Sequence, residues 1–426
     1  MVNVTIQSIC AMPSWCSGKR RPANTVAKVG HNSWPDAAMR EVARTRIRLL
    51  RREWPAFQVC GYTGLVFAIA LGLFVAGKTG LALWVISVIA MAAMATFLLL
   101  AFATKIITGE EQLIYYHQEI AIMLVSALVA RLLHRPVLPY VDVTILGVGT
   151  FLAFGRIGCL MVGCCHGRPC AWGIRYTRDH ARQGFPPYLV SVRLFPIQAL
   201  ESLFVLAVVI AGTIAVLQGR PAGTAFALYT VGYGSVRFCL EFFRGDSDRP
   251  YTFGFSQGQW LSLWLMCGAV WAELTGRMPF HAWNGAVTLS LPLLMMMVAL
   301  WRKFDRTESF LIHHPQHVSE VAGAIDSLSD FCRLLESERI PDTIPVARTS
   351  TGFQISAGNI HGDKHVPAHF TISRHGGHIS GKAAANMADL ILQLKPESTR
   401  RELIPGTEEG VFHLVLEPVR MNGERS

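Results

Sequence analysis

Residues 81–103 read LALWVISVIAMAAMATFLLLAFA, a run without a single charged side chain. About 20 apolar residues in a helix match the hydrocarbon thickness of a bilayer. Apolar runs of similar length recur between Ala56 and Trp301. The pattern predicts an all-α polytopic membrane protein.

The apolar runs predict seven or eight transmembrane helices, because several of the runs are short or imperfect. They lie near residues 56–77, 80–104, 117–133, 139–162, 196–217, 222–243, 257–274 and 283–301. Two longer polar connections, at about 163–195 and 244–256, are rich in Gly, Pro, Arg and aromatic residues. Functional side chains are expected in these connections, because loops on a rigid scaffold commonly carry function.

The overall composition agrees with a membrane location. The chain of 426 residues is 51% hydrophobic and only 16% charged, with a formal net charge of +10. Since the basic residues stand beside apolar runs, anionic lipid is a simpler partner for them than nucleic acid, which is not expected to bind. The ten cysteines do not follow the spacing of a secreted disulfide scaffold, so most of them are expected to be reduced and packed as small apolar residues.

Residues 1–55 form a basic N-terminal tail. In segment 38–54 arginines alternate with apolar residues, which predicts either an amphipathic helix on an anionic membrane surface or a solvated basic tail. No signal peptide is expected, because the first long apolar run begins too late and is too long. Met39, which opens the basic segment, is an alternative start.

Residues 56–301 are expected to form the membrane domain and residues 302–426 a small soluble α+β domain of unknown role. A helical apolar period runs from Val318 to Leu335, and strand-like runs lie near 352–356, 368–373 and 411–416. A second helix is expected near 380–394. This domain is rich in histidines that would bind metal, sense pH or belong to a polar surface; they include His313, His314, His317, His361, His365, His369, His375 and His378. A regulatory role, or the binding of a substrate protein, is the other function considered for this domain.

Charged side chains inside the predicted spans are the main functional signal, because each costs at least ~2.5 kcal/mol at the centre of a bilayer. Arg156 ends one span, while Arg237, Glu241 and Arg244 follow one another at spacings of four and three, on one helix face. An internal Arg–Glu pair that satisfies itself is the structural alternative. Arginine suits a phosphodiester, because its planar fork donates two parallel hydrogen bonds and stays charged in a dry site.

His117 opens another predicted span, directly after Tyr115 and Tyr116. A histidine at the membrane interface would orient a lipid head group or accept a proton from a thiol. A structural role is the alternative.

Five motifs occur in a fixed order within residues 110–265. They are His117; Gly155-Arg156-Ile157-Gly158 followed by Gly163 and Gly167; Phe195-Pro196-Ile197-Gln198-Ala199-Leu200-Glu201; Arg237 with Glu241; and Gly254-Phe255-Ser256-Gln257-Gly258-Gln259-Trp260-Leu261-Ser262. This order resembles the prolipoprotein diacylglyceryl transferase family. The resemblance matches His117 to the family's essential histidine, and Arg156 and Arg237 to its essential arginines.

The resemblance implies a membrane transferase that moves a diacylglyceryl group from phosphatidylglycerol to the lipobox cysteine thiol of a prolipoprotein. A thioether forms and glycerol phosphate is released. Arg156 and Arg237 would hold the phosphate, His117 would assist with the head group or the proton, and Glu241 would orient Arg237. The residues expected to bind substrate are Gly158, Gly163, Gly167, Arg168, Gln198, Glu201, Tyr233 and Arg244.

The same resemblance implies that no metal or nucleotide cofactor is required. The expected partners are phosphatidylglycerol, a lipobox-containing precursor protein and membrane lipids. The expected location is the bacterial inner (plasma) membrane, which the chain would cross several times. The basic segment 40–52 favours a cytoplasmic N-terminus, whereas the family's reaction face points outward, so the orientation stays open.

The chain departs from the family pattern at several positions. Cys159 and Cys164 stand where the family has an asparagine and an acidic residue, and Gln118-Glu119 replaces a glycine pair. Two other functions therefore remain open. One is a transporter or lipid-binding protein that keeps the fold without the chemistry. The other is a zinc, copper or thiol redox site built from Cys159, Cys164, Cys165, His166 and Cys170.

Overall fold

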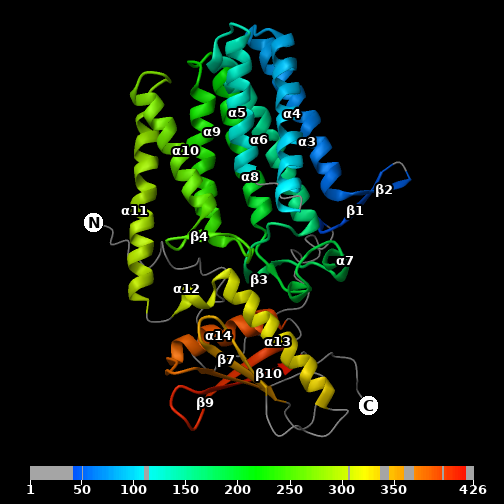
Figure 1. Cartoon of the computed structure of the whole chain (residues 1–426), viewed down its shortest axis with the longest axis vertical. Coiled ribbons are helices and arrows are strands. Elements are labelled where there is room, and N and C mark those ends of the chain that lie inside the picture. The colour runs from blue at the N-terminus through cyan, green and yellow to red at the C-terminus, as the bar shows by residue number, and fades with distance from the viewer. Residues whose placement is uncertain are drawn as a thin grey trace.

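The computed structural model describes residues 42–49, 51–109, 115–305, 308–335, 345–358, 369–395 and 398–418. A bundle of long helices forms one end of the molecule, and a small sheet with its helices forms the other (Figure 1). Within the described residues, a helix occupies each of the eight segments expected to be apolar spans. These helices are α3 (Ala56–Thr79), α4 (Leu83–Thr108), α5 (Tyr115–Leu132), α6 (Val137–Val162), α8 (Ile197–Leu217), α9 (Thr224–Leu240), α10 (Gln257–Leu274) and α11 (Ala282–Phe304).

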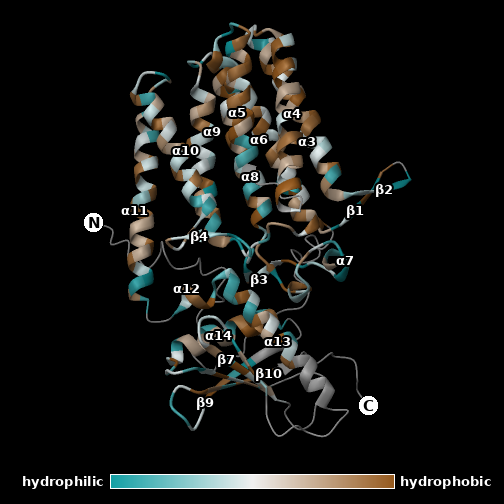
Figure 2. Cartoon of the chain, in the orientation of Figure 1, coloured by the Kyte–Doolittle hydropathy of each residue, from teal (hydrophilic) through white to brown (hydrophobic). Residues whose placement is uncertain are grey.

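The helix bundle belongs to a multi-pass membrane protein. Across the described part of the chain, five helices are long and apolar enough to cross a membrane by length and composition: α3, α4, α6, α8 and α11. Apolar residues dominate the bundle, while polar residues gather at its lower end (Figure 2). Helices α5, α9 and α10 are shorter, with 18, 17 and 18 residues. The expectation of seven or eight spans therefore stays a prediction.

Helix α6 is the central helix of the bundle. In its most apolar stretch 56% of the residues are buried, against 28% or less in the other four long apolar helices among the described residues. Ile145 and Leu146 of α6 share one hydrophobic core with Val205 of α8 and Tyr229 of α9. Arg156 is buried near the end of this central helix, so the fold places a charged side chain in the interior of the bundle close to one of its ends.

The buried Asp142 of α6 holds the start of α9 at the opposite end of the bundle. The backbone N–H groups of Gly223 and Phe226 donate to its two carboxylate oxygens at 2.6 and 2.8 Å. A carboxylate at a helix N-terminus satisfies amides that have no partner within the helix and is stabilised by the helix dipole.

Replacing Asp142 by alanine should therefore lower the stability of the protein without altering its site. The loss should be on the order of 3 kcal/mol, because two charge-assisted hydrogen bonds disappear and buried amides stay unpaired. Thermal unfolding in detergent measures the loss. Asp142→Asn, which keeps one acceptor oxygen, should lose less, and equal losses in the two variants would contradict the capping role.

The two polar connections meet at the lower end of the bundle (Figure 1). The first contains β3 (Pro169–Ile174), α7 (Arg178–Ala181) and η1 (Pro187–Leu189). The short turn η2 (Glu241–Phe243) leads from α9 into the second, which contains β4 (Tyr251–Thr252) and β5 (Phe255–Ser256). Backbone bonds join them, because Arg168 donates to the Phe243 carbonyl at 3.0 Å and Gly245 to that of His166 at 2.9 Å. These bonds bring the two connections, in which functional side chains are expected, to one place in the fold.

The C-terminal part has a five-stranded antiparallel sheet with strand order β6-β7-β8-β10-β9. Its elements are α12 (Ser309–Ile312), α13 (Pro315–Leu335), β6 (Val346–Arg348), β7 (Phe353–Gly358), β8 (His369–Arg374), α14 (Gly381–Leu394), β9 (Ser398–Pro405) and β10 (Phe412–Pro418). The expected α+β class is confirmed, together with both helices and three of the strands. Strands β6 and β9 were not predicted.

The hydrophobic core of the C-terminal part extends into the first polar connection. Tyr176 and Leu189 of that connection pack in one cluster with Val321 of α13, Ile355 of β7 and Leu390 of α14. Helices α13 and α14 lie between the sheet and the bundle (Figure 1). The part of the chain predicted as a soluble domain therefore covers the end of the bundle where the polar connections lie, while its boundary at residue 302 stays a prediction.

Of the two alternatives for segment 38–54, an amphipathic helix or a solvated basic tail, the helix is wrong for the part that is described. Arg46–Leu49 (β1) and Arg52–Pro55 (β2) form an antiparallel hairpin, with Arg51 at a φ of 66° in the turn. Arginine and apolar residues alternate over Arg46–Leu49, and this period of two suits a strand better than a helix. Met39 and residues 38–41 lie outside the described residues.

Candidate functional site

A buried carboxylate on α8, Glu201, ties two arginines of other helices together. Arg156 Nε of α6 lies 3.0 Å from Glu201 Oε2, and Arg237 Nη1 of α9 lies 3.4 Å from the same oxygen. The Tyr233 hydroxyl of α9 donates to Glu201 Oε1 at 2.8 Å. The two predicted phosphate-binding arginines therefore converge, although they stand on separate helices.

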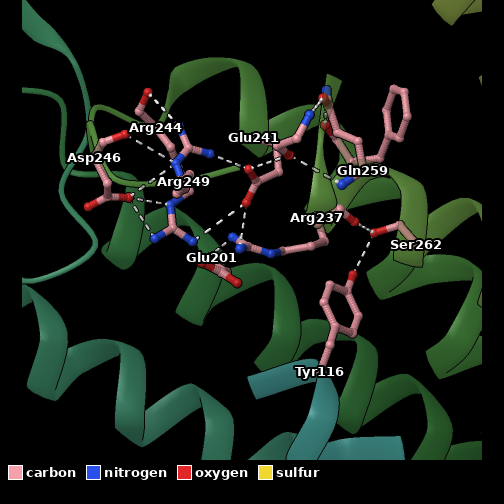
Figure 3. Close-up of polar contacts among 12 residues, drawn as sticks. Tyr116, Glu201, Arg237, Glu241, Arg244, Asp246, Arg249, Gln259 and Ser262 are labelled. Carbon is pink, nitrogen blue, oxygen red and sulfur yellow. Dashed lines mark hydrogen bonds and ion pairs between the residues drawn. The ribbon is translucent and has the colours of Figure 1, made fainter. Parts of the chain in front are cut away.

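Glu241 is the second carboxylate that holds arginines at this site (Figure 3). Its Oε1 lies 2.5 Å from Arg237 Nη2 and 3.5 Å from Arg244 Nη1, as two ion pairs. Its Oε2 forms a short ion pair with Arg249 and accepts the Ser256 hydroxyl at 2.7 Å. The predicted pairing of Arg237 with Glu241 is confirmed, whereas the single helix face expected for Arg237, Glu241 and Arg244 is not, because α9 ends at Leu240 and Arg244 has extended backbone; Arg244 still reaches Glu241 from the connection.

Asp246 completes the cluster on the second polar connection. Its Oδ2 lies 2.6 Å from Arg244 Nη2 and 3.6 Å from Arg249 Nε. Arg168 Nε reaches the same segment and donates to the Arg244 carbonyl at 3.2 Å. We call Arg156, Arg237, Arg244 and Arg249, with Glu201, Glu241 and Asp246, the arginine cluster. Each of its four guanidinium groups pairs with at least one of its three carboxylates, and the cluster as a whole carries a formal net charge of +1.

The structural alternative of one self-satisfied Arg–Glu pair does not describe this cluster. Arg156, Glu201 and Arg237 come from three helices, and each side chain is at most 8% exposed. Buried ion pairs rarely add net stability, because the desolvation of both groups offsets their attraction. An excess of buried guanidinium charge at one point of the fold is more typical of a site that binds an anion.

The face of α5 that is buried in the bundle carries Tyr116 and Glu119, and not His117 as the sequence suggested. His117 is exposed, and no described contact joins it to the arginine cluster. Tyr116 is buried instead, with its hydroxyl 2.5 Å from Ser262 Oγ of α10. Glu119, three residues later on the same face, is also buried. The catalytic role expected for His117 stays a prediction.

The predicted glycines hold the backbone around the site. An added Cβ at Gly163 would lie 2.9 Å from Phe185 Cδ2, and the φ of +88° suits glycine at this helix C-terminus. At Gly167 an added Cβ would overlap the Phe195 carbonyl oxygen. Gly158 faces Cys60 and Phe57, where α6 packs against α3. A glycine at each position is explained by packing, and substrate binding by them stays a prediction.

Gln198 and the cysteines stand next to the arginine cluster. Gln198 Nε2 donates to the Cys164 carbonyl at 2.9 Å. The thiols of Cys159, Cys164 and Cys165 lie within 4.8 Å of one another. Hydrogen bonds with the Cys159 and Cys164 thiols, together with the positive charges of Arg244 and Arg156, lower the pKa of the Cys165 thiol.

His166 and Cys170 do not join this group of thiols. The His166 ring nitrogen Nδ1 lies 2.9 Å from the Gly167 carbonyl oxygen, and the Cys170 thiol donates to the Trp172 carbonyl in a short hydrogen bond. The five-residue cysteine and histidine cluster considered from the sequence is therefore reduced to three cysteines.

Sequence reasoning did not select Asp246, Arg249, Ser256 or Ser262 as site residues. Three of them lie in or beside the second polar connection, and Ser262 belongs to the last of the five motifs. Two signals were available: the expectation that polar connections between spans carry function, and the last of the five motifs, which contains both Ser256 and Ser262. Their partners are far away in sequence, for example Tyr116 for Ser262, and one sequence does not reveal such pairs.

The C-terminal part contacts the site through His314. Its ring packs against Tyr251, with ring centroids 4.6 Å apart. Burial, followed by the nearby positive charges of Arg168, Arg249 and Arg302, lowers the pKa of His314 from 6.5 to about 4. Of the other histidines, His317 lies 2.9 Å from the Ile312 carbonyl oxygen through Nδ1. His361 and His365 lie outside the described residues.

The contact made by His314 should weaken in acid. Because the folded-state pKa lies below the unfolded value, neutral His314 contributes stability above about pH 6.5, and this stability is lost as the pH falls toward about 4. Thermal unfolding should therefore show a smaller loss between pH 7 and 4.5 for His314→Gln than for the wild type. His375→Gln, at an exposed position, serves as the control and should follow the wild type.

Comparisons with known proteins match the helix bundle to one family. Residues 59–275 match the family model described as prolipoprotein diacylglyceryl transferase. The chain is 34% identical to the phosphatidylglycerol–prolipoprotein diacylglyceryl transferase of Dehalococcoides mccartyi over 131 residues, which are 30% of this chain and 48% of the relative. It is 31% identical to the enzyme of the same name from Clostridium tetani over 133 residues, 30% of this chain and 50% of the relative.

The chain thus spans about half the length of the curated relatives that it matches. The region that matches the family model extends from α3 to α10 and contains all seven residues of the arginine cluster. It ends before α11 and before the C-terminal sheet.

Proposed function

This chain belongs to the prolipoprotein diacylglyceryl transferase family, and we propose that it moves a diacylglyceryl group from phosphatidylglycerol to a cysteine thiol of a precursor protein. The observation that carries the proposal is the arginine cluster at the end of the bundle, whose charge is positive by one. A phosphodiester carries one negative charge and offers oxygen pairs that match the guanidinium fork. The names of the relatives supply the donor and the acceptor.

In this proposal the arginine cluster acts on the leaving group. The acceptor sulfur attacks the glycerol carbon next to the phosphate, a C–S bond forms, and the C–O bond breaks with its electron pair leaving on glycerol phosphate. Arg156 and Arg237, fixed by Glu201, stabilise the negative charge that develops there. Fixed donors in a dry site are worth more than the same donors in water, because they do not have to reorganise.

Three roles in this reaction rest on contacts of the described residues. Glu241 orients Arg237, as the 2.5 Å ion pair supports. Arg244 and Arg249 hold Glu241 and Asp246 and keep the second polar connection in place. Tyr233 holds Glu201 through its hydroxyl. His117 keeps the proposed part in handling the head group or the proton, a part that would require it to approach from its exposed position.

We also propose that the protein lies in the bacterial inner membrane with its arginine cluster toward the outer face, because the proposed acceptor is an exported precursor. The first polar connection, the start of α3 and the C-terminal sheet would then share that side (Figure 1). Protease access to a site inserted at the exposed Gly184, in spheroplasts, tests the orientation. Protection of that site would exclude exported acceptors.

The experiment that tests the reaction uses the full chain in phosphatidylglycerol liposomes with a lipobox peptide. We expect the peptide to gain the mass of a diacylglyceryl group in a bond that resists hydroxylamine, as a thioether does. A peptide with serine in place of cysteine is the control and should gain no mass. Binding of phosphatidylglycerol without any product would favour the lipid-binding or transport function instead.

A further inference from the structure

The thiols of Cys159, Cys164 and Cys165 form a group that the arginine cluster does not use. Cys159 stands in the last turns of α6, while Cys164 and Cys165 follow the end of that helix. Their sulfur atoms all lie within 4.8 Å of one another. We propose that these three thiols bind one zinc ion, which leaves a fourth position open for the thiol of the acceptor.

The spacing of the sulfur atoms suits such an ion. A zinc–sulfur bond of about 2.3 Å and a tetrahedral angle place two sulfur ligands roughly 3.8 Å apart. The sulfur atoms lie at most 4.8 Å apart, which is within about 1 Å of that value. Adjacent cysteines rarely meet a third ligand in a regular helix. Here Gly163 ends α6 at a φ of 88° and Cys165 has a φ of 53°, so the chain turns back toward Cys159.

Neighbouring side chains hold the turn that carries the thiols. Gln198 fixes the Cys164 carbonyl with a hydrogen bond of 2.9 Å, and the Phe185 and Tyr176 rings pack where a side chain at Gly163 would lie. Ligands held by their surroundings bind a metal more tightly than ligands that must first be ordered. Cys164 is exposed and gives the ion a path of entry.

The charges around the thiols also fit zinc. Three thiolates and one divalent ion together carry one negative charge, and Cys165 interacts electrostatically with the guanidinium groups of Arg156 and Arg244. A bare divalent cation would be repelled there, whereas the thiolate complex is attracted. Among the described residues, the neighbouring His166 and Cys170 side chains contact backbone carbonyls and do not join the three thiols as a fourth ligand.

An open fourth position has a use in the proposed function, on which this step of the inference rests. A thiol that coordinates zinc gives its proton to solvent and becomes a thiolate. That thiolate sulfur would then attack the glycerol carbon, the C–O bond would break, and glycerol phosphate would leave beside the guanidinium groups. The zinc ion would thus supply the activated nucleophile, and no electrons are exchanged with an oxidant or reductant.

Metal content tests the site independently of any activity. The full chain, purified in detergent without chelators, should contain about one zinc per chain by mass spectrometry. Cys159→Ser and Cys164→Ser should each lose most of it, whereas Cys267→Ser, a matched change at an exposed cysteine of α10, should keep it. Wild-type protein without stoichiometric zinc, or a disulfide between two of the three cysteines, would overturn the inference.

A measurement on the wild type guards against variants that fail to fold. After chelation and reloading with cobalt(II), the protein should show sulfur-to-cobalt charge-transfer absorption. Addition of a lipobox peptide should change the cobalt spectrum, and the serine peptide should not. If the protein binds cobalt but neither peptide changes its absorption spectrum, the acceptor thiol does not coordinate the metal ion. A cobalt response without transfer would instead count against the proposed reaction.

Discussion

Replacing Arg237 by glutamine should lower the rate of diacylglyceryl transfer by about 10²–10³-fold, the usual loss for one donor that stabilises charge in the transition state. The fold should survive. Without Arg237, Glu201 still pairs with Arg156, and Glu241 still pairs with Arg249. The initial rate in phosphatidylglycerol liposomes measures the loss, and the unfolding temperature checks the fold.

Two further variants separate charge from geometry at this position. Arg237→Lys keeps the charge but loses the fork that donates two parallel bonds, so we expect it to recover only a small part of the rate. Arg182→Gln is the control, because Arg182 lies on the first polar connection with a side chain 79% exposed. Full activity in Arg237→Gln would remove Arg237 from the proposed phosphate site.

Replacing Glu201 by glutamine should instead destabilise the whole bundle. Glu201 is the carboxylate with which Arg156 pairs among the described residues, so the substitution leaves a buried guanidinium charge uncompensated. Breaking one side of a buried ion pair typically costs about 3–5 kcal/mol. We expect a clear fall in the unfolding temperature in detergent, together with loss of transfer.

A double variant identifies the cause of that fall. Glu201→Gln combined with Arg156→Gln removes both charges and should be more stable than Glu201→Gln alone, because no buried charge is left unpaired. Glu273→Gln is the matched control, since Glu273 is a buried carboxylate that bonds Asn284 at 2.5 Å and lies outside the arginine cluster. A double variant that is less stable than both single variants would argue against this explanation.

The distribution of roles explains why the two substitutions should differ. Arg237 has two carboxylate partners, Glu201 and Glu241, and each of them keeps another arginine when Arg237 is removed. Arg156, by contrast, forms an ion pair with only one carboxylate among the described residues, that of Glu201. The cluster is therefore expected to tolerate the loss of a cation better than the loss of the carboxylate that joins three helices.

The alternation of apolar and polar segments was sufficient to predict the helices of the bundle. A span such as 139–162 is recognised from its own residues, because the cost of placing polar groups in lipid acts on each segment separately. The pairing of Arg237 with Glu241 was predictable for the same reason, since it depends only on the helix period. The hairpin 46–55 was missed, because a period of two was read as a helical pattern.

The sequence by itself determined a multi-pass helical membrane protein, the order of its motifs and the presence of arginines in its spans. Only the tertiary structure decided that Glu201 joins Arg156 to Arg237, that Tyr116 and Glu119 face inward while His117 is exposed, and that three cysteines converge. The physical reason is the range of the interactions. Hydropathy and helix period are properties of neighbours along the chain, whereas the binding site consists of side chains brought together by helix packing.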